Sequence, residues 1–127
     1  MENTVKSFLN QKSFVIAGSF RNETKYAYRI LKKLKDKGYT VYPVNPGIKE
    51  VDRIKCYANV NDIQEEVDVA NLVTPPAVTE KIVVDCKKKG IKKIWLQPGA
   101  ESQKAIRFCK ENNMEIVYGI CVLIEAT

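Results

Sequence analysis

The feature that most constrains the fold is residues 13–28, where an apolar run passes through a glycine turn into a helical pattern. The run at residues 14–17 has the composition of a strand buried on both faces. It ends at Gly18 and Ser19, and helical periodicity begins near Tyr26. A strand that leads through such a turn into a helix directs the free N–H groups of the helix at the loop. This stretch therefore predicts a site for the phosphates of a nucleotide-like ligand.

Strand and helix patterns alternate along the rest of the chain. Expected helices are residues 25–37, 78–89 and 102–112, with Gly38 and Gly90 at positions typical of helix C-caps. Expected strands are residues 13–17, 40–44, 67–73, 93–96 and 115–118. Short connections and right-handed crossovers then predict an α/β fold, a doubly wound, three-layer, Rossmann-like parallel sheet of about five strands.

The remaining segments carry weaker signals. Residues 1–12 are expected to form a short amphipathic helix, and residues 48–57 an irregular segment. The apolar tail at residues 120–124 is expected to pack back on the body of the protein. Ser102 is expected to be an N-cap. In the helix at 78–89, four apolar residues are expected to face inward: Val78, Ile82, Val83 and Cys86.

Length and composition exclude several classes of protein. The 127 residues suit one domain over 1–127, and no apolar run approaches the roughly 20 residues that span a bilayer. A cytoplasmic protein without membrane association is expected, with its four cysteines as free thiols. Histidine is absent, which removes Ser-His-Asp, Cys-His and phosphohistidine chemistry. No catalytic residue and no metal site is predicted, and the net charge of +6 is attributed to a solvated lysine-rich surface rather than to nucleic-acid binding.

The residues that follow the expected strands are glycines, prolines, amides and cations. The ends of the first and third strands lack the carboxylates of a phospho-acceptor site, and no P-loop motif is present. Only Gly18 remains of a dinucleotide fingerprint, and Asn45 stands where an NAD-binding acid is expected. NADP binding stays open as the less favoured alternative, because Arg21 or Lys49 can meet an extra phosphate.

Five stretches together carry a resemblance to a known family. They are Val-Ile-Ala-Gly-Ser at 15–19, Gly-Tyr-Thr-Val-Tyr-Pro-Val-Asn-Pro at 38–46, Val-Asp-Val-Ala-Asn at 67–71, Ile-Trp-Leu-Gln-Pro-Gly at 94–99, and Cys121. The chain resembles the small, single-domain CoA-binding proteins with a Rossmann-like fold over roughly residues 12–125. It is also similar to the nucleotide-binding domain of the succinyl-CoA synthetase alpha subunit.

The resemblance implies a role for each residue at the strand ends. The pyrophosphate or the 3′-phosphate would be held by Gly18, Ser19 and Arg21, with Lys25 adding positive charge. The nucleotide side of the site would be lined by Asn45, Pro46 and Lys49. The adenine pocket would be shaped by Val73, Thr74 and Pro75, and the pantetheine path would be bordered by Gln97. Phe20 departs from the family's loop and is expected to close or reshape the phosphate site.

The function expected from these residues is binding of coenzyme A or an acyl-CoA, without chemistry of its own. Two alternatives stay open: an enzyme or enzyme subunit that uses NAD(P), and a domain that binds protein or nucleic acid. The expected assembly is a monomer or a homodimer, with a small nucleotide cofactor as the partner.

Overall fold

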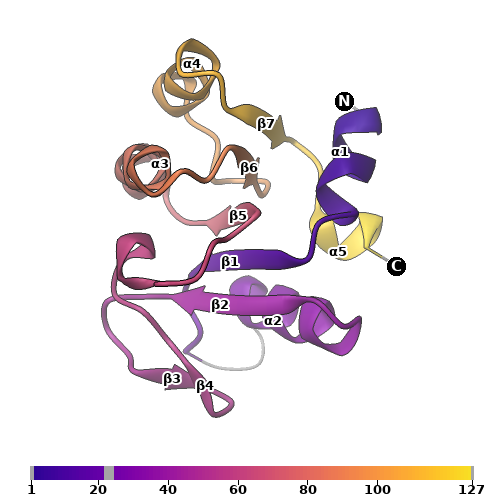
Figure 1. Ribbon diagram of the computed structural model, residues 1–127, viewed down its shortest axis with the longest axis vertical. Helices are drawn as coiled ribbons and strands as arrows, with labels where there is room; N and C mark the ends of the chain where they lie inside the picture. Colours follow the sequence, from indigo (N-terminus) through magenta and orange to yellow (C-terminus); the bar gives the residue numbers. More distant parts are fainter. Residues whose placement is uncertain (1, 22–24, 127) are drawn as a thin grey trace.

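The computed structural model describes residues 2–21 and 25–126 and builds one parallel sheet from five strands (Figure 1). Their order across the sheet is β2-β1-β5-β6-β7, and every neighbouring pair is parallel. The strands are β1 (Ser13–Gly18), β2 (Thr40–Val44), β5 (Val69–Val73), β6 (Lys93–Leu96) and β7 (Glu115–Tyr118). This arrangement confirms the predicted doubly wound fold.

Helices cover both faces of the sheet, which makes three layers (Figure 1). One face carries α3 (Pro76–Lys89), α4 (Gln103–Glu111) and the short η1 (Val60–Asp62). The other carries α1 (Glu2–Leu9), α2 (Tyr26–Asp36) and α5 (Val122–Glu125). Strand β1 serves both layers because its side chains alternate between the faces. Val15 and Ala17 pack toward α3, whereas Phe14 and Ile16 pack toward α2.

Residues 48–57, expected to be irregular, contain a small antiparallel hairpin. Strands β3 (Glu50–Val51) and β4 (Ile54–Lys55) pair directly around a turn at Asp52 and Arg53, whose φ angles are 48° and 67°. Val51 is buried in the α2-side core, so the hairpin is attached to the body of the protein. The segment is therefore ordered by its own strand pairing and by apolar packing.

Helix α3 differs from its expected position. It begins at Pro76, two residues earlier than predicted, and its buried residues are Thr79, Val83 and Cys86. The expectation that Val78 faces inward is wrong, because this side chain is 42% exposed. Ile82 is only half-buried and packs at the margin of the core.

The capping predictions are confirmed. Gly38 and Gly90 follow α2 and α3 with φ angles of 96° and 95°, the left-handed conformation that glycine adopts without steric cost. The hydroxyl of Ser102 accepts a hydrogen bond from the backbone N–H of Ala105 at 3.2 Å and so caps α4. The same hydroxyl donates to Glu80 Oε2 at 2.5 Å, which links α4 to α3.

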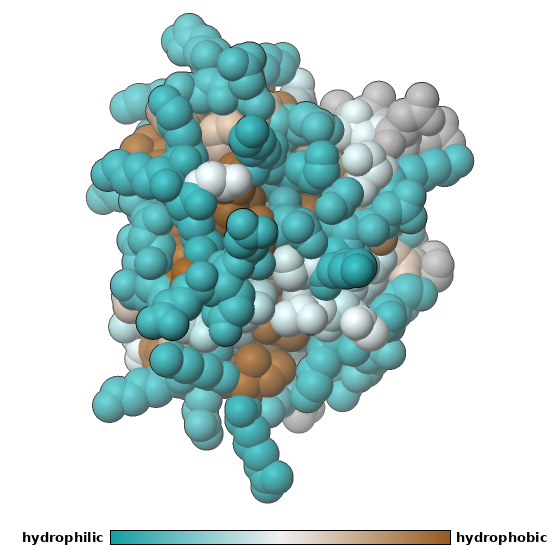
Figure 2. Space-filling model, in the orientation of Figure 1, coloured by the Kyte–Doolittle hydropathy of each residue, from teal (hydrophilic) through white to brown (hydrophobic). Residues whose placement is uncertain are grey.

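The chain after β7 packs back on the sheet, as expected. Trp95 Nε1 donates to the carbonyl of Ile120 at 2.8 Å, and the backbone N–H of Val122 donates to Gln97 Oε1 at 3.0 Å. Hydrophilic side chains cover most of the face shown in Figure 2. Within residues 2–21 and 25–126, none of the helices is long and apolar enough to cross a membrane.

Candidate functional site

A cleft of about 750 Å³ opens where β1, β2 and β5 end. From β1 the chain turns to one side to form β2, and β5 then pairs on the other side of β1. Strand order reverses at β1, and in open α/β sheets ligands bind beyond the carboxyl ends of the strands at such a point. The cleft therefore lies where the fold itself favours a ligand.

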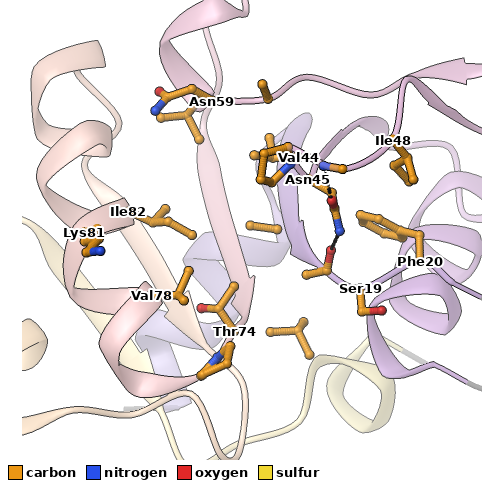
Figure 3. A pocket seen from close by; sticks show the side chains of 18 of the residues that line it. Ser19, Phe20, Val44, Asn45, Ile48, Asn59, Thr74, Val78, Lys81 and Ile82 are labelled. Carbon is orange, nitrogen blue, oxygen red and sulfur yellow. Dashed lines mark hydrogen bonds between the residues drawn. The ribbon is translucent and has the colours of Figure 1, made fainter.

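The floor of the cleft is a tight junction between the ends of β1 and β2. Asn45 Nδ2 donates to the carbonyl of Gly18 at 2.7 Å, and Asn45 Oδ1 accepts from the N–H of Gly47 at 2.7 Å (Figure 3). The two bonds fix the orientation of the amide and tie one loop to the other. Gly18 is close-packed, because a Cβ there would lie 2.8 Å from both Ala27 Cβ and the carbonyl oxygen of Val73.

The walls of the cleft are apolar and come from different elements. Ile48, after β2, and Val78, in the first turns of α3, are 37% and 42% exposed and lie on opposite sides of the cleft (Figure 3). Val44, Val60 and Ile82 also belong to the apolar lining. Apolar walls with a few polar groups are typical of pockets that bind small molecules and cofactors.

Polar groups stand at separate places in this lining. Ser19 and Arg21 follow β1 and line the cleft. Asn59 and Lys81 lie across the cleft from Ser19 (Figure 3). Thr74, at the end of β5, pairs its hydroxyl with that of Thr79 at 2.6 Å, and this bond joins β5 to α3. The lining thus carries two cations, Arg21 and Lys81, and one carboxylate, Asp85, so its net positive charge favours an anionic ligand.

Most of the sequence-predicted residues meet in this cleft. Those that line it are Gly18, Ser19, Phe20, Arg21, Asn45, Pro46, Val73, Thr74 and Pro75. The remaining three, Lys25, Lys49 and Gln97, are not among its lining residues. Contacts of any of these residues with a ligand stay a prediction.

Lys25 and Gln97 have other surroundings. Lys25 precedes α2 in an extended conformation and makes no side-chain capping bond, and residues 22–24 lie outside the described residues. Gln97 is completely buried and donates from Nε2 to Asn71 Oδ1 at 2.6 Å while accepting from Val122. The side chain of Gln97 therefore links β5, β6 and the start of α5.

Phe20 forms part of the wall rather than a plug. Its side chain is 7% exposed and packs in the α2-side core, yet it also borders the cleft beside Asn45 (Figure 3). The cleft keeps its volume of about 750 Å³ with Phe20 in this position. The side chain therefore lines the cleft without filling it, and its effect on a bound phosphate stays a prediction.

Sequence reasoning missed several lining residues, which lie on both sides of the cleft. They come from the segment after β2, from the segment after the hairpin and from one side of α3: Ile48, Ala58, Asn59, Val60, Val78, Lys81, Ile82 and Asp85. The signal in α3 was the spacing of 78, 81, 82 and 85, which places these positions on one helical face. Nothing in the local sequence pointed to Asn59.

Two of the thiols, Cys56 and Cys121, each contact a polar neighbour. Burial raises the pKa of Cys56, whose Sγ donates at 3.7 Å to the carbonyl of Asn45, a residue that lines the cleft. Tyr26 and Cys121 contact each other through hydroxyl and thiol. Burial, helped by that hydrogen bond, raises the pKa of Tyr26 to about 12. The contact joins the start of α2 to the residue before α5.

The sheet order and the cleft at its switch point define a Rossmann-like nucleotide-binding domain. Within that class, the chain belongs to the CoA-binding domain family, whose model matches residues 12–127.

Two curated relatives are ligases. The chain is 42% identical over 81 residues to the ADP-forming acetate–CoA ligase of Methanocaldococcus jannaschii, a match that covers 64% of this chain and 12% of the ligase. It is 34% identical over 131 residues to the alpha subunit of ADP-forming acetate–CoA ligase II of Pyrococcus furiosus, covering 94% of this chain and 29% of the subunit. The chain therefore spans less than a third of the length of either relative.

A solved structure of similar size shares the fold. It is a conserved hypothetical protein from Pyrococcus furiosus, 37% identical in sequence, with a TM-score of 0.86. The match covers 91% of this chain and 99% of that one. This unit of structure thus also occurs in a chain that contains little else.

Proposed function

We propose that this chain binds coenzyme A or an acyl-CoA in the cleft at the ends of β1, β2 and β5. The observation that carries the proposal is the convergence of nine sequence-predicted residues on one cleft of about 750 Å³. That volume falls within the roughly 300–1,000 Å³ of pockets that bind small molecules. Membership of the CoA-binding domain family supports the same ligand.

The arrangement of polar groups suggests how the ligand lies. The phosphates are placed beside Ser19 and Arg21, because these residues follow β1 and bring a hydroxyl and a guanidinium to one end of the cleft. The nucleoside then extends between the end of β2 and the start of α3. Both walls are apolar there, so burial of a nucleobase is favoured.

We further propose that the chain performs no chemistry by itself. It contains no histidine among its 127 residues, and a carrier of CoA requires none. The two ligases described above are several times longer than this chain, and they support a second possibility for its cellular role. In that role the chain supplies bound CoA to a partner that contributes the remaining ligase machinery.

A thermal-shift panel tests the ligand. CoA, acetyl-CoA, dephospho-CoA, NAD, NADP and ATP are compared at equal concentration. A ligand that binds only the native state stabilises it by about 2.7 kcal/mol at a hundredfold excess over Kd. We expect CoA or acetyl-CoA to stabilise most and dephospho-CoA less. A larger shift with NADP, or no shift with any of the six, contradicts the proposal; salt-sensitive retention on DNA or RNA then indicates the third alternative.

Substitution of Arg21 tests the phosphate end. Arg21→Ala is expected to raise the Kd for CoA about tenfold, because a charged hydrogen bond contributes roughly 1.5–3 kcal/mol and this side chain is exposed. Arg107→Ala, on the exposed face of α4 and away from the cleft, is the matched control. Titration calorimetry with all three proteins measures the effect. Equal affinities in the two variants would remove Arg21 from the site.

A further inference from the structure

The hairpin formed by β3 and β4 lies beside β2, the edge strand of the main sheet, and continues directly from a wall of the cleft (Figure 1). Ile48 lines this wall with a side chain that is 37% exposed (Figure 3). The next residue, Lys49, closes the base of the hairpin, because its carbonyl accepts from the backbone N–H of Cys56 at 2.8 Å. The position of Ile48 in the wall therefore depends on where the hairpin lies.

The hairpin is short and mostly exposed. Its strands pair at two positions, Glu50 with Lys55 and Val51 with Ile54. Val51 is buried in the α2-side core and Ile54 is half-buried, whereas the other residues of the two strands are exposed. Strand pairing and apolar packing thus each supply only a small part of what a larger hairpin would have.

The turn of the hairpin carries backbone strain. Asp52 and Arg53 have φ angles of 48° and 67°, in the left-handed region that is unfavourable for residues with a Cβ. Glycine adopts such angles without this cost, but neither position has it. Because the ladder is short, a contact made by the turn has a large influence on whether the hairpin keeps this arrangement.

The turn makes one such contact with α2. The hydroxyl of Tyr28, in the first turn of α2, donates to Asp52 Oδ2 at 2.7 Å. Hydrogen bonds to a carboxylate are among the stronger ones in proteins. Neither Tyr28 nor Asp52 is among the residues that line the cleft. Any effect of this bond on a ligand is therefore transmitted by the hairpin.

We propose that the Tyr28–Asp52 hydrogen bond is a latch that holds the hairpin, and with it Ile48, in the arrangement that binds ligand. Tyr28 and Asp52 are positioning residues, because they act through Ile48. Without the latch, the strained turn relaxes and the hairpin leaves α2 in a fraction of the molecules. The apparent Kd rises as the fraction with a complete wall falls. The inference rests on the proposed binding of CoA and adds a determinant of affinity outside the cleft.

Titration calorimetry with CoA tests the latch in the unaltered protein, Tyr28→Phe, Asp52→Ala and the double variant. Each single change is expected to raise the Kd about two- to tenfold, the factor that one hydrogen bond typically contributes to an equilibrium constant. The effect of Tyr28→Phe should disappear in the Asp52→Ala background, because both changes break the same bond. Loss of the negative charge at residue 52 would by itself favour an anionic ligand, so weaker binding has the opposite sign to the electrostatic effect.

Two further variants serve as controls. Asp52→Asn retains an acceptor oxygen and a side chain that tolerates a left-handed backbone, so its Kd should stay within about twofold of that of the unaltered protein. Asp36→Ala removes an exposed carboxylate of α2 that pairs with Lys32 rather than with the hairpin, and it should not weaken binding. Thermal unfolding verifies that every variant is folded.

Hydrogen exchange measures the latch in the absence of ligand. The amide of Cys56, which bonds to Lys49 across the base of the hairpin, should exchange about two- to tenfold faster in Tyr28→Phe. The amides of β1 and β5 should exchange at the rates of the unaltered protein. A uniform increase over the whole sheet would reveal a global loss of stability and would overturn the local latch.

The remaining outcomes separate this inference from the proposed function. An unchanged Kd in Tyr28→Phe, or a loss in Asp52→Asn as large as in Asp52→Ala, overturns the latch while CoA binding by the unaltered protein stands. Absence of any heat when CoA is added to the unaltered protein overturns this inference and the proposed function together.

Discussion

Substitution of Gly18 by alanine probes the packing that shapes the floor of the cleft. Gly18 does not adopt a positive φ, so its backbone conformation alone admits alanine. If the site had free space, the change would stabilise the protein by about 0.4–1 kcal/mol, because alanine lowers the conformational entropy of the unfolded chain. The added Cβ would instead lie 2.8 Å from Ala27 Cβ and 2.8 Å from the carbonyl oxygen of Val73. Overpacking of this kind costs about 1–3 kcal/mol, so the expected sign is destabilising.

The assay is thermal unfolding of the unaltered protein, of Gly18→Ala and of a control, Gly47→Ala. A loss of about 1–3 kcal/mol lowers the Tm by roughly 3–15 °C for a chain of this length. At Gly47 the nearest atom among the described residues is Asn45 Oδ1, at 3.2 Å, so a shift of a few tenths of an ångström accommodates the added Cβ. The control should therefore change little. An unchanged or raised Tm for Gly18→Ala would refute the close packing of β1 against α2 and β5.

Two further predictions concern hydrogen bonds remote from the cleft walls. Ser102→Ala removes the N-cap of α4 and the bond to Glu80, and is expected to lower the free energy of unfolding by about 1 kcal/mol in urea titrations; a loss below about 0.3 kcal/mol would contradict it. The pKa of Tyr26 is raised from 10.0 to about 12 in the folded protein, so its contribution to stability is complete below pH 10 and declines as the pH rises toward 12. Tyr26→Phe should therefore lose less stability than the unaltered protein between pH 9 and 12, and parallel pH profiles would show that Tyr26 does not cause the decline.

Much of the fold follows from local patterns in the sequence. Residues 14–17 are apolar on both faces and form most of β1, an interior strand of the sheet whose two faces are both covered. Gly38 and Gly90 end α2 and α3 where their positions predicted. These signals are local, since a buried strand and a helix C-cap each depend on a few neighbouring residues.

The differences arise where structure depends on distant contacts. The turn of the hairpin contains Asp52 and Arg53 at positive φ, without the glycine that usually marks such a turn. Strand β5 begins at Val69 rather than at residue 67, and Asp68 Oδ2 instead accepts from the backbone N–H groups of Lys12 and Ser13 at 3.0 and 3.1 Å. Neither arrangement is visible in a short window of sequence.

The candidate site likewise combines residues that the local sequence predicts with residues that only distant contacts bring together. Residues directly after strands, such as Ser19 and Thr74, were predicted because parallel strands end at a common edge. Asn59 and Asp85 were not, because their proximity depends on how the segment after the hairpin meets α3. Gln97 also follows a strand, yet its amide bonds to Asn71 and Val122 in the interior.

The bonds from Trp95 to Ile120 and from Val122 to Gln97 bear on how this protein can be shortened or fused. A truncation immediately after Tyr118 would keep all five strands of the sheet but deprive an indole N–H and a glutamine carbonyl of their partners. Burial makes such orphaned groups costly. Residues 119–122 should therefore be retained in any fusion protein, and a flexible linker should be attached beyond them.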